Sequence, residues 1–112
     1  MVAKKNSDRK VYFNGKFVPE SEAKISIYDS ALMFGDMVFE MTRSFNKEHF
    51  KLEEHIDRLF LGLKILRINL DVSKEELVSI CKETAKINKD LFLKDDEHRL
   101  MIDVSRGLLG IY

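Results

Sequence analysis

The sequence predicts an α+β domain in which two α-helices pack on an antiparallel β-sheet. Several short apolar segments with strand-like alternation are separated by turn residues. Two longer segments carry apolar residues at the three- and four-residue spacing of amphipathic helices. Strands joined by short turns pair as antiparallel neighbours, and helices then cover one face of the sheet.

Length and composition are those of one small domain. The chain has 112 residues, 45% of them hydrophobic, and its 19 basic and 19 acidic side chains cancel. This balance gives no electrostatic reason to expect a nucleic-acid or membrane partner, and no apolar run approaches the ~18 residues of a membrane span. The polar amino terminus has no signal-peptide core, so we expect a cytoplasmic location, with residues 1–10 disordered or frayed.

The first strands are predicted by turn residues. Residues 11–13 and 17–18 flank Asn14-Gly15, a dipeptide that favours a type I′ hairpin turn, and Pro19 ends the second strand. The alternation of residues 23–27 predicts a further short strand. Asp29 and Ser30 are expected to cap a helical turn that stops at Gly35.

Residues 37–45 predict a longer strand whose two faces differ. One face carries Met37, Phe39, Met41, Arg43 and Phe45, and the other carries Val38, Glu40, Thr42 and Ser44. Asn46-Lys47 is expected to turn the chain toward the next segment. Residues 99–105 predict the last strand, with Leu100, Ile102 and Val104 facing one way.

The helices are the clearest elements of the sequence. Residues 52–66 form an apolar stripe of Leu52, Ile56, Leu59, Phe60, Leu63 and Leu66. Ser73 and Glu76 make a capping box that opens a second helix through about Asn88. Cys81, the only cysteine, lies on the apolar side of this helix, and we interpret it as a packing residue.

Few side chains have a pattern that indicates chemistry. His49, His55 and His98 are not spaced as metal ligands, so no metal site is predicted, and His55 is expected to pack or hydrogen-bond on its helix. The sequence has no glycine-rich phosphate motif. Arg58 borders the apolar stripe of the first helix, where it is either an ordinary solvated arginine or a contact to an anion.

Three segments together resemble the amino-terminal domain of the class IV aminotransferases. They are residues 35–40, residues 50–52 and His55-Ile56-Asp57-Arg58-Leu59, and the resemblance runs from about Val11 to Tyr112. These fold-type IV enzymes use pyridoxal 5'-phosphate (PLP) and include branched-chain aminotransferase, D-amino-acid aminotransferase and aminodeoxychorismate lyase. The resemblance implies a homodimeric enzyme that transfers an amino group from an amino acid to a 2-oxo acid.

The resemblance assigns roles to three residues. It implies that Arg58 contacts the PLP phosphate and that Phe34 and Phe39 line the substrate pocket, although both Phe residues could instead fill the core. Phe39 favours branched-chain substrates, whereas Met37 and Lys47 depart from the family's pattern, so aminodeoxychorismate lyase and D-amino-acid aminotransferase remain alternatives. If Arg58 acts only on phosphate, Arg58→Ala should weaken PLP binding and barely change the stability of the apo domain.

The resemblance also implies what the chain lacks. The Schiff-base lysine of the family belongs to a larger second domain, and no lysine here stands in the matching context. Residues 11–112 are therefore expected to be an amino-terminal domain that alone is catalytically incomplete and does not bind PLP specifically. The alternative is a free-standing, non-catalytic binding or dimerisation domain. Self-association is expected through apolar residues, namely Leu32, Met33, Phe34, Leu108, Leu109 and Ile111.

Overall fold

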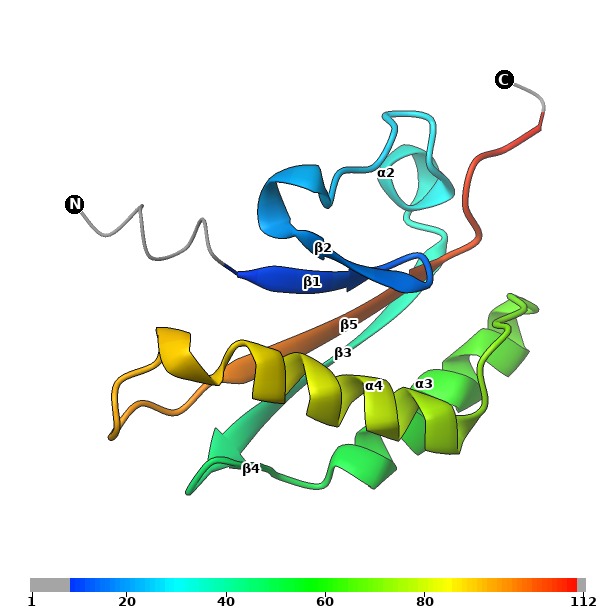
Figure 1. Cartoon of the computed structure of the whole chain (residues 1–112). Helices are drawn as coiled ribbons and strands as arrows, with labels where there is room; N and C mark the ends of the chain where they lie inside the picture. Colours follow the sequence, from blue (N-terminus) through cyan, green and yellow to red (C-terminus); the bar gives the residue numbers. More distant parts are fainter. Residues whose placement is uncertain (1–8, 111–112) are drawn as a thin grey trace.

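A computed structural model describes residues 9–110, which form two antiparallel sheets and three α-helices (Figure 1). The strands are β1 (Lys10–Phe13), β2 (Lys16–Pro19), β3 (Met37–Phe45), β4 (Glu48–His49) and β5 (Arg99–Ser105). The helices are α2 (Ser30–Phe34), α3 (Leu52–Leu66) and α4 (Lys74–Ile87), with 3₁₀ turns η1 (Glu20–Glu22) and η2 (Lys89–Leu91). The predicted α+β fold is confirmed, but its sheet is divided into a β1–β2 hairpin and a β4-β3-β5 sheet.

The hairpin forms as predicted and is attached to α4. Asn14 and Gly15 have φ angles of 49° and 97°, as a type I′ turn requires. Asn88, the residue that ends α4, accepts a hydrogen bond from the Lys10 backbone N at 2.8 Å and donates to its carbonyl O at 3.0 Å. The first strand begins at Lys10, one residue before the predicted boundary and within the segment of residues 1–10 that was expected to be frayed. Residues 1–8 of that segment lie outside the described part of the chain.

The predicted strand at residues 23–27 is wrong. The segment contains no strand, and Ile25 and Ile27 are 57% and 66% exposed. Its backbone makes local hydrogen bonds instead, from Ala23 N to Glu20 O and from Lys24 N to Glu22 O. Alternation alone does not make a strand, because a strand also needs a neighbour that accepts its backbone hydrogen bonds.

Helix α2 begins and ends as predicted. The Asp29 side chain accepts a hydrogen bond from Ala31 N, and Gly35 ends the helix in the left-handed region at φ 67°. Ser30 is fully buried, and its backbone N donates to the carbonyl of Gly107 at 2.9 Å. The short helix is therefore fixed to the segment that follows β5.

The sheet formed by β3 and β5 has one covered face and one open face. Its covered face carries Val38 and Ile102, which pack with α3 and α4. The buried apolar core contains Leu52, Ile56, Leu59, Leu63, Ile68, Leu77, Cys81 and Ile102. Burial raises the pKa of the Cys81 thiol to about 11, in agreement with a packing role.

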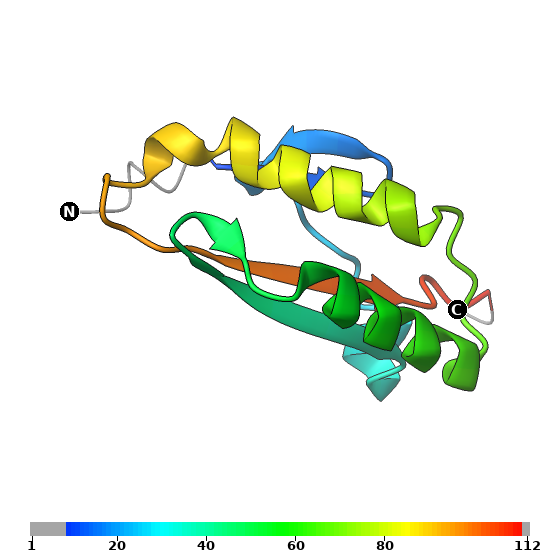
Figure 2. The ribbon, with the colours of Figure 1, turned by 90° about the horizontal axis from the view of Figure 1, so that it is seen from below.

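The arrangement of the helices is visible in Figures 1 and 2. Helix α3 packs along β3, and α4 contacts both α3 and β1, so that it joins the hairpin to the rest of the domain. Gly62 permits the close approach of α3, because a Cβ atom there would lie 2.8 Å from Val38 Cγ1. No helix in the described part of the chain is long and apolar enough to cross a membrane.

The capping box of α4 provides a first prediction, on stability. Ser73 Oγ accepts a hydrogen bond from Glu76 N, and the Glu76 carboxylate accepts one from Ser73 N, both at 3.0 Å. We expect Ser73→Ala to lower the free energy of unfolding by about 1 kcal/mol, because it leaves helical N–H groups without a partner. Urea denaturation of Ser73→Ala beside Ser73→Asp checks this, since aspartate also caps helices. Equal losses for both variants would contradict the capping argument.

Candidate functional site

Glu40 is the centre of a polar cluster between β3 and α3. Its side chain is 8% exposed and accepts hydrogen bonds from Arg58 Nε at 2.6 Å, Arg58 Nη2 at 2.8 Å and His55 Nδ1 at 2.7 Å. Residues three apart on a helix lie on one flank, so His55 and Arg58 reach the same carboxylate. A carboxylate only accepts hydrogen bonds, and Nδ1 of His55 is therefore the donor to Glu40. The predicted hydrogen-bonding role of His55 is confirmed.

The charge of Glu40 is strongly stabilised. The hydrogen bonds from Arg58 lower the pKa of Glu40 to about 2, with a smaller contribution from His55, while burial acts in the opposite direction. The same pairing raises the pKa of Arg58. Both groups are thus ionised across the physiological pH range, and the pair is bidentate.

Arg58 presents its free side outward. The side chain is 70% exposed, and its hydrogen bonds within the described residues use only Nε and Nη2. Glu40 fixes the plane of the guanidinium, which leaves Nη1 available to an anion. This arrangement can bind a phosphate or carboxylate oxygen without reorganising the arginine.

The two Phe residues of the predicted pocket are on the surface of this chain. Phe34 is 63% exposed on α2, and Phe39 is 62% exposed on β3, so neither fills the core. Phe39 and Glu40 are consecutive in a strand and point to opposite faces of the sheet. The structure therefore places Arg58 on the helix-covered side and Phe39 on the open side, and it does not enclose Arg58, Phe34 and Phe39 in one cavity.

The open face of the sheet carries several large apolar side chains besides Arg43, Arg99 and Asp103. Exposed side chains on this face are Phe39 (62%), Met41 (41%), Phe45 (51%) and Met101 (54%). Leu32, Phe34 and Leu108, which we expected at an interface, are more than 60% exposed, whereas Met33 and Leu109 are half-buried and Ile111 lies outside the described residues. Exposed large apolar side chains that share one face of a sheet are typical of a surface that contacts another molecule.

Sequence reasoning missed two residues that hold the site together. Glu40 could have been suspected, since a carboxylate among Val38, Thr42 and Ser44 must find a cation if that face is buried. Arg106 pairs with the Asp36 carboxylate and donates to the carbonyl oxygens of Leu66 and Arg67 at the end of α3. It thereby connects the end of β5 to the segment that precedes β3.

The potential for metal binding is low in this part of the protein. Across residues 9–110 no three His, Cys, Asp or Glu side chains converge to hold a metal ion. The exposed guanidinium of Arg58 is instead suited to an organic anion.

Comparison with known proteins connects this geometry to one family. A family model described as amino-transferase class IV matches residues 37–112. A protein of Methanocaldococcus jannaschii named "Putative branched-chain-amino-acid aminotransferase" is 42% identical over 102 residues, or 91% of this chain and 34% of that protein. Aminodeoxychorismate lyase of Bacillus subtilis is 34% identical over 88% of this chain and 32% of its own length. D-alanine aminotransferase of Staphylococcus haemolyticus is also similar.

Solved structures agree with the sequence matches. The branched-chain amino acid aminotransferase from Escherichia coli has a TM-score of 0.82 and 27% identity, covering 94% of this chain and 35% of that chain. The chain spans about a third of the length of the curated relatives that it matches.

Proposed function

Because the chain belongs to the class IV aminotransferase family, we propose that residues 11–112 form the amino-terminal domain of a PLP-dependent aminotransferase. The enzyme transfers an amino group from an amino acid to a 2-oxo acid. The observation that carries this proposal is the guanidinium of Arg58, held by the buried carboxylate of Glu40 with its other edge exposed. The family is PLP-dependent, and bound PLP supplies an electron sink for bond breaking at the α-carbon of the amino acid.

The residues present fit the phosphate end of the cofactor. Phosphate is an oxyanion that arginine binds through charge-assisted hydrogen bonds, and Arg58 has an uncommitted edge for it. A branched-chain amino acid aminotransferase solved in complex with N-(5'-phosphopyridoxyl)-L-glutamate has a TM-score of 0.68 to this chain, at 35% identity over 73% of it and 29% of that chain. In this proposal Arg58 holds the phosphate and Glu40 positions Arg58.

Branched-chain amino acids are the preferred substrate class. The relative at 42% identity bears that name, and Phe34 and Phe39 offer apolar surface to an aliphatic side chain. The alternatives are an aminodeoxychorismate lyase or a D-amino-acid aminotransferase, because relatives of both activities are similar over most of this chain. A free-standing binding or dimerisation domain is the alternative of another class.

The exposed apolar face supports assembly with further protein. The side chains of Phe39, Met41 and Met101 are the kind of surface that a second domain or subunit covers. We propose that the catalytic lysine comes from another domain and that the enzyme acts as a homodimer in the cytoplasm.

A substrate panel with the full-length protein tests the proposed function. With PLP present, we expect amino transfer from leucine, isoleucine or valine to 2-oxoglutarate, measured as glutamate formed. Transfer from D-alanine alone would favour the D-amino-acid enzyme, and conversion of aminodeoxychorismate without amino transfer would favour the lyase. If the protein neither binds PLP nor catalyses any of the three reactions, the alternative of a non-catalytic binding or dimerisation domain would be favoured.

A further inference from the structure

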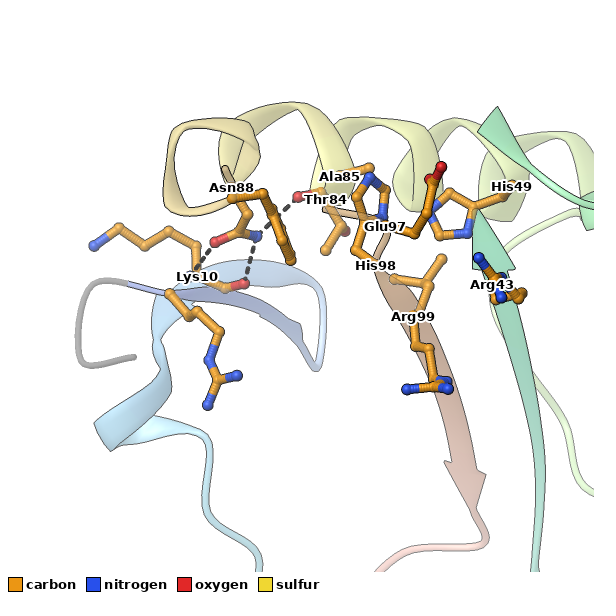
Figure 3. Close-up of a pocket in the computed structure, with 12 residues that line it drawn as sticks. Lys10, Arg43, His49, Thr84, Ala85, Asn88, Glu97, His98 and Arg99 are labelled. Atoms are coloured by element: carbon orange, nitrogen blue, oxygen red, sulfur yellow. Dashed lines mark hydrogen bonds between the residues drawn. The ribbon is translucent and has the colours of Figure 1, made fainter. Parts of the chain in front are cut away.

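Two histidine rings connect four segments of the chain at one end of the domain. The ring of His98 packs on the rings of Phe92 and His49, with centroid distances of 4.8 Å and 4.7 Å. His49 Nδ1 in turn lies 2.7 Å from Thr42 Oγ1. The two histidines lie between α4 and the strands (Figure 3). We refer to these four side chains as the histidine clasp, because they join β3, β4, the residue before β5 and the residue after η2.

The clasp has no acceptor for a second ring hydrogen on His49. His49 Nε2 is buried and has no hydrogen-bond partner among the described residues. A neutral imidazole carries one N–H group, whereas a protonated one donates from both nitrogens. Whichever nitrogen carries the hydrogen in the neutral ring, a protonated His49 holds an N–H at Nε2 that has nothing to donate to. A buried charged donor without an acceptor costs free energy.

The surroundings of the two rings also oppose a positive charge. Burial lowers the pKa of His49 below its ordinary value of 6.5, and the neighbouring His98 lowers it further. Burial and the charge of Lys47 lower the pKa of His98, while Glu97 acts in the opposite direction. Both rings therefore bind a proton less readily in the folded protein than when they are exposed to water.

The charged groups around the clasp are mostly cations. Both rings line two cavities, of about 520 Å³ and 910 Å³, and the carboxylates of these cavities are Glu48 on β4, Glu53 on α3 and Glu97 before β5. The cations come from every other neighbouring element, namely Arg9 and Lys10 near the start of β1, Arg43 on β3, Lys47 before β4, Lys82 and Lys86 on α4, Lys89 on η2, Lys94, and Arg99 on β5. Within residues 9–110 His55 is the only histidine that pairs with a carboxylate, so no acid in this part of the chain compensates a charge on the clasp.

We propose that the histidine clasp is an acid-sensitive contact, in which protonation of His49 or His98 releases β4 and residues 92–98 from each other. Above pH 6.5 both rings are neutral and the clasp is closed. As the pH falls below 6.5, the opened state takes up protons more readily than the closed state, so the clasp weakens down to the lower pKa values of the folded protein. Strand β4 leads almost directly into α3, and its release loosens the segment that precedes the helix carrying Arg58.

Hydrogen exchange of the full-length protein at pH 7.5 and pH 5.5 tests the clasp, with labelling times scaled to the intrinsic exchange rate at each pH. We expect peptides that cover residues 46–50 and 92–98 to exchange severalfold faster at pH 5.5, because local opening is favoured by proton uptake. Peptides from the second half of α3 should not change. The test is independent of the proposed function, since it measures no cofactor binding or activity.

Two variants assign the acid response to the clasp. His98→Phe keeps a ring against Phe92 and His49 but cannot be protonated, so the response should fall to about half or less on a logarithmic scale, because one of two titrating rings is removed. His55→Gln is the matched control, since it removes the third histidine of the chain, which lies outside the clasp on α3. It should keep the full response at residues 46–50 and 92–98.

The contrary outcomes are equally specific. Equal exchange of the wild-type protein at both pH values would exclude an acid-sensitive contact, and equal acceleration of all peptides would show general loosening of the domain. A full response in His98→Phe, or its loss in His55→Gln, would remove the clasp as the cause. If His98→Phe does not fold, NMR titration of the histidine rings in the wild-type protein decides: signals of His49 and His98 that titrate below pH 6.5 support the proposal, and titration at or above pH 6.5 overturns it.

Discussion

Arg58→Ala is expected to weaken PLP binding by the full-length enzyme roughly 10- to 100-fold. That range corresponds to the loss of charge-assisted hydrogen bonds to a phosphate. Arg58→Lys should recover only part of the affinity, because an ammonium keeps the charge but cannot pair with both Glu40 and a phosphate as a planar fork does. Cofactor titration followed by absorbance or fluorescence measures both effects.

The structure adds a second expectation for the same variant. The sequence alone predicts little change in the stability of the apo domain, but Arg58 donates two hydrogen bonds to the buried Glu40 carboxylate. Its removal leaves that charge with His55 alone, so the apo protein should unfold at a lower temperature. Lys64→Ala, which removes an exposed cation from the same helix, should change neither property. If the Arg58→Ala protein is destabilised but binds PLP with unaltered affinity, Arg58 stabilises the fold through Glu40 and does not contact the cofactor.

Local signals were sufficient for most elements of the fold. The Asn14-Gly15 turn, the Ser73 capping box and the apolar stripe of residues 52–66 each act over a few neighbouring residues, and the elements that they predict are present. The segment of residues 23–27 was mispredicted because strand formation depends on a distant partner. The attachment of the β1–β2 hairpin to α4 likewise depends on the contact between Asn88 and Lys10, which lie far apart in sequence.

The alternation of residues along β3 did not indicate which face of the strand is buried. The strand buries its polar side chains and exposes its aromatic ones. Burial of polar groups is possible only when each has a partner. Thr42 pairs with His49, Ser44 with Glu97, and Glu40 with Arg58. The Ser44 partner comes from a distant part of the chain, and the other two pairings also depend on how the elements pack.

For the candidate site, the sequence predicted the identity of the arginine but not its orientation. Arg58 was identified from the resemblance of its motif, and its exposed position agrees with a role in binding. The orientation of Arg58 by Glu40 depends on the packing of α3 on β3, and neither the motif nor the composition predicts that packing. Phe34 and Phe39 were assigned to a pocket, and their exposure is compatible with one that further protein completes.

Glu40→Gln is expected to destabilise the protein by about 2 kcal/mol at neutral pH. The difference between an ordinary carboxyl pKa of 4.5 and the pKa of about 2 for Glu40 is equivalent to roughly 3 kcal/mol at most. The partner Arg58 is 70% exposed, and solvent screening reduces that figure. The Gln side chain keeps the shape of Glu40 but replaces hydrogen bonds to a charge by weaker ones.

The dependence on pH distinguishes a loss of stability caused by removing the charge of Glu40 from one caused by poorer packing of the Gln side chain. The pKa of Glu40 is lower in the folded than in the unfolded protein, so its stabilisation is complete above about pH 4.5 and declines as the pH falls toward 2. The difference in unfolding free energy between wild type and Glu40→Gln should therefore shrink through that interval. Urea denaturation of both proteins from pH 7 to pH 2 measures it, with the exposed Glu83→Gln as control. A difference that stays constant down to pH 2 would mean that the variant perturbs packing, and that the charge of Glu40 does not stabilise the fold.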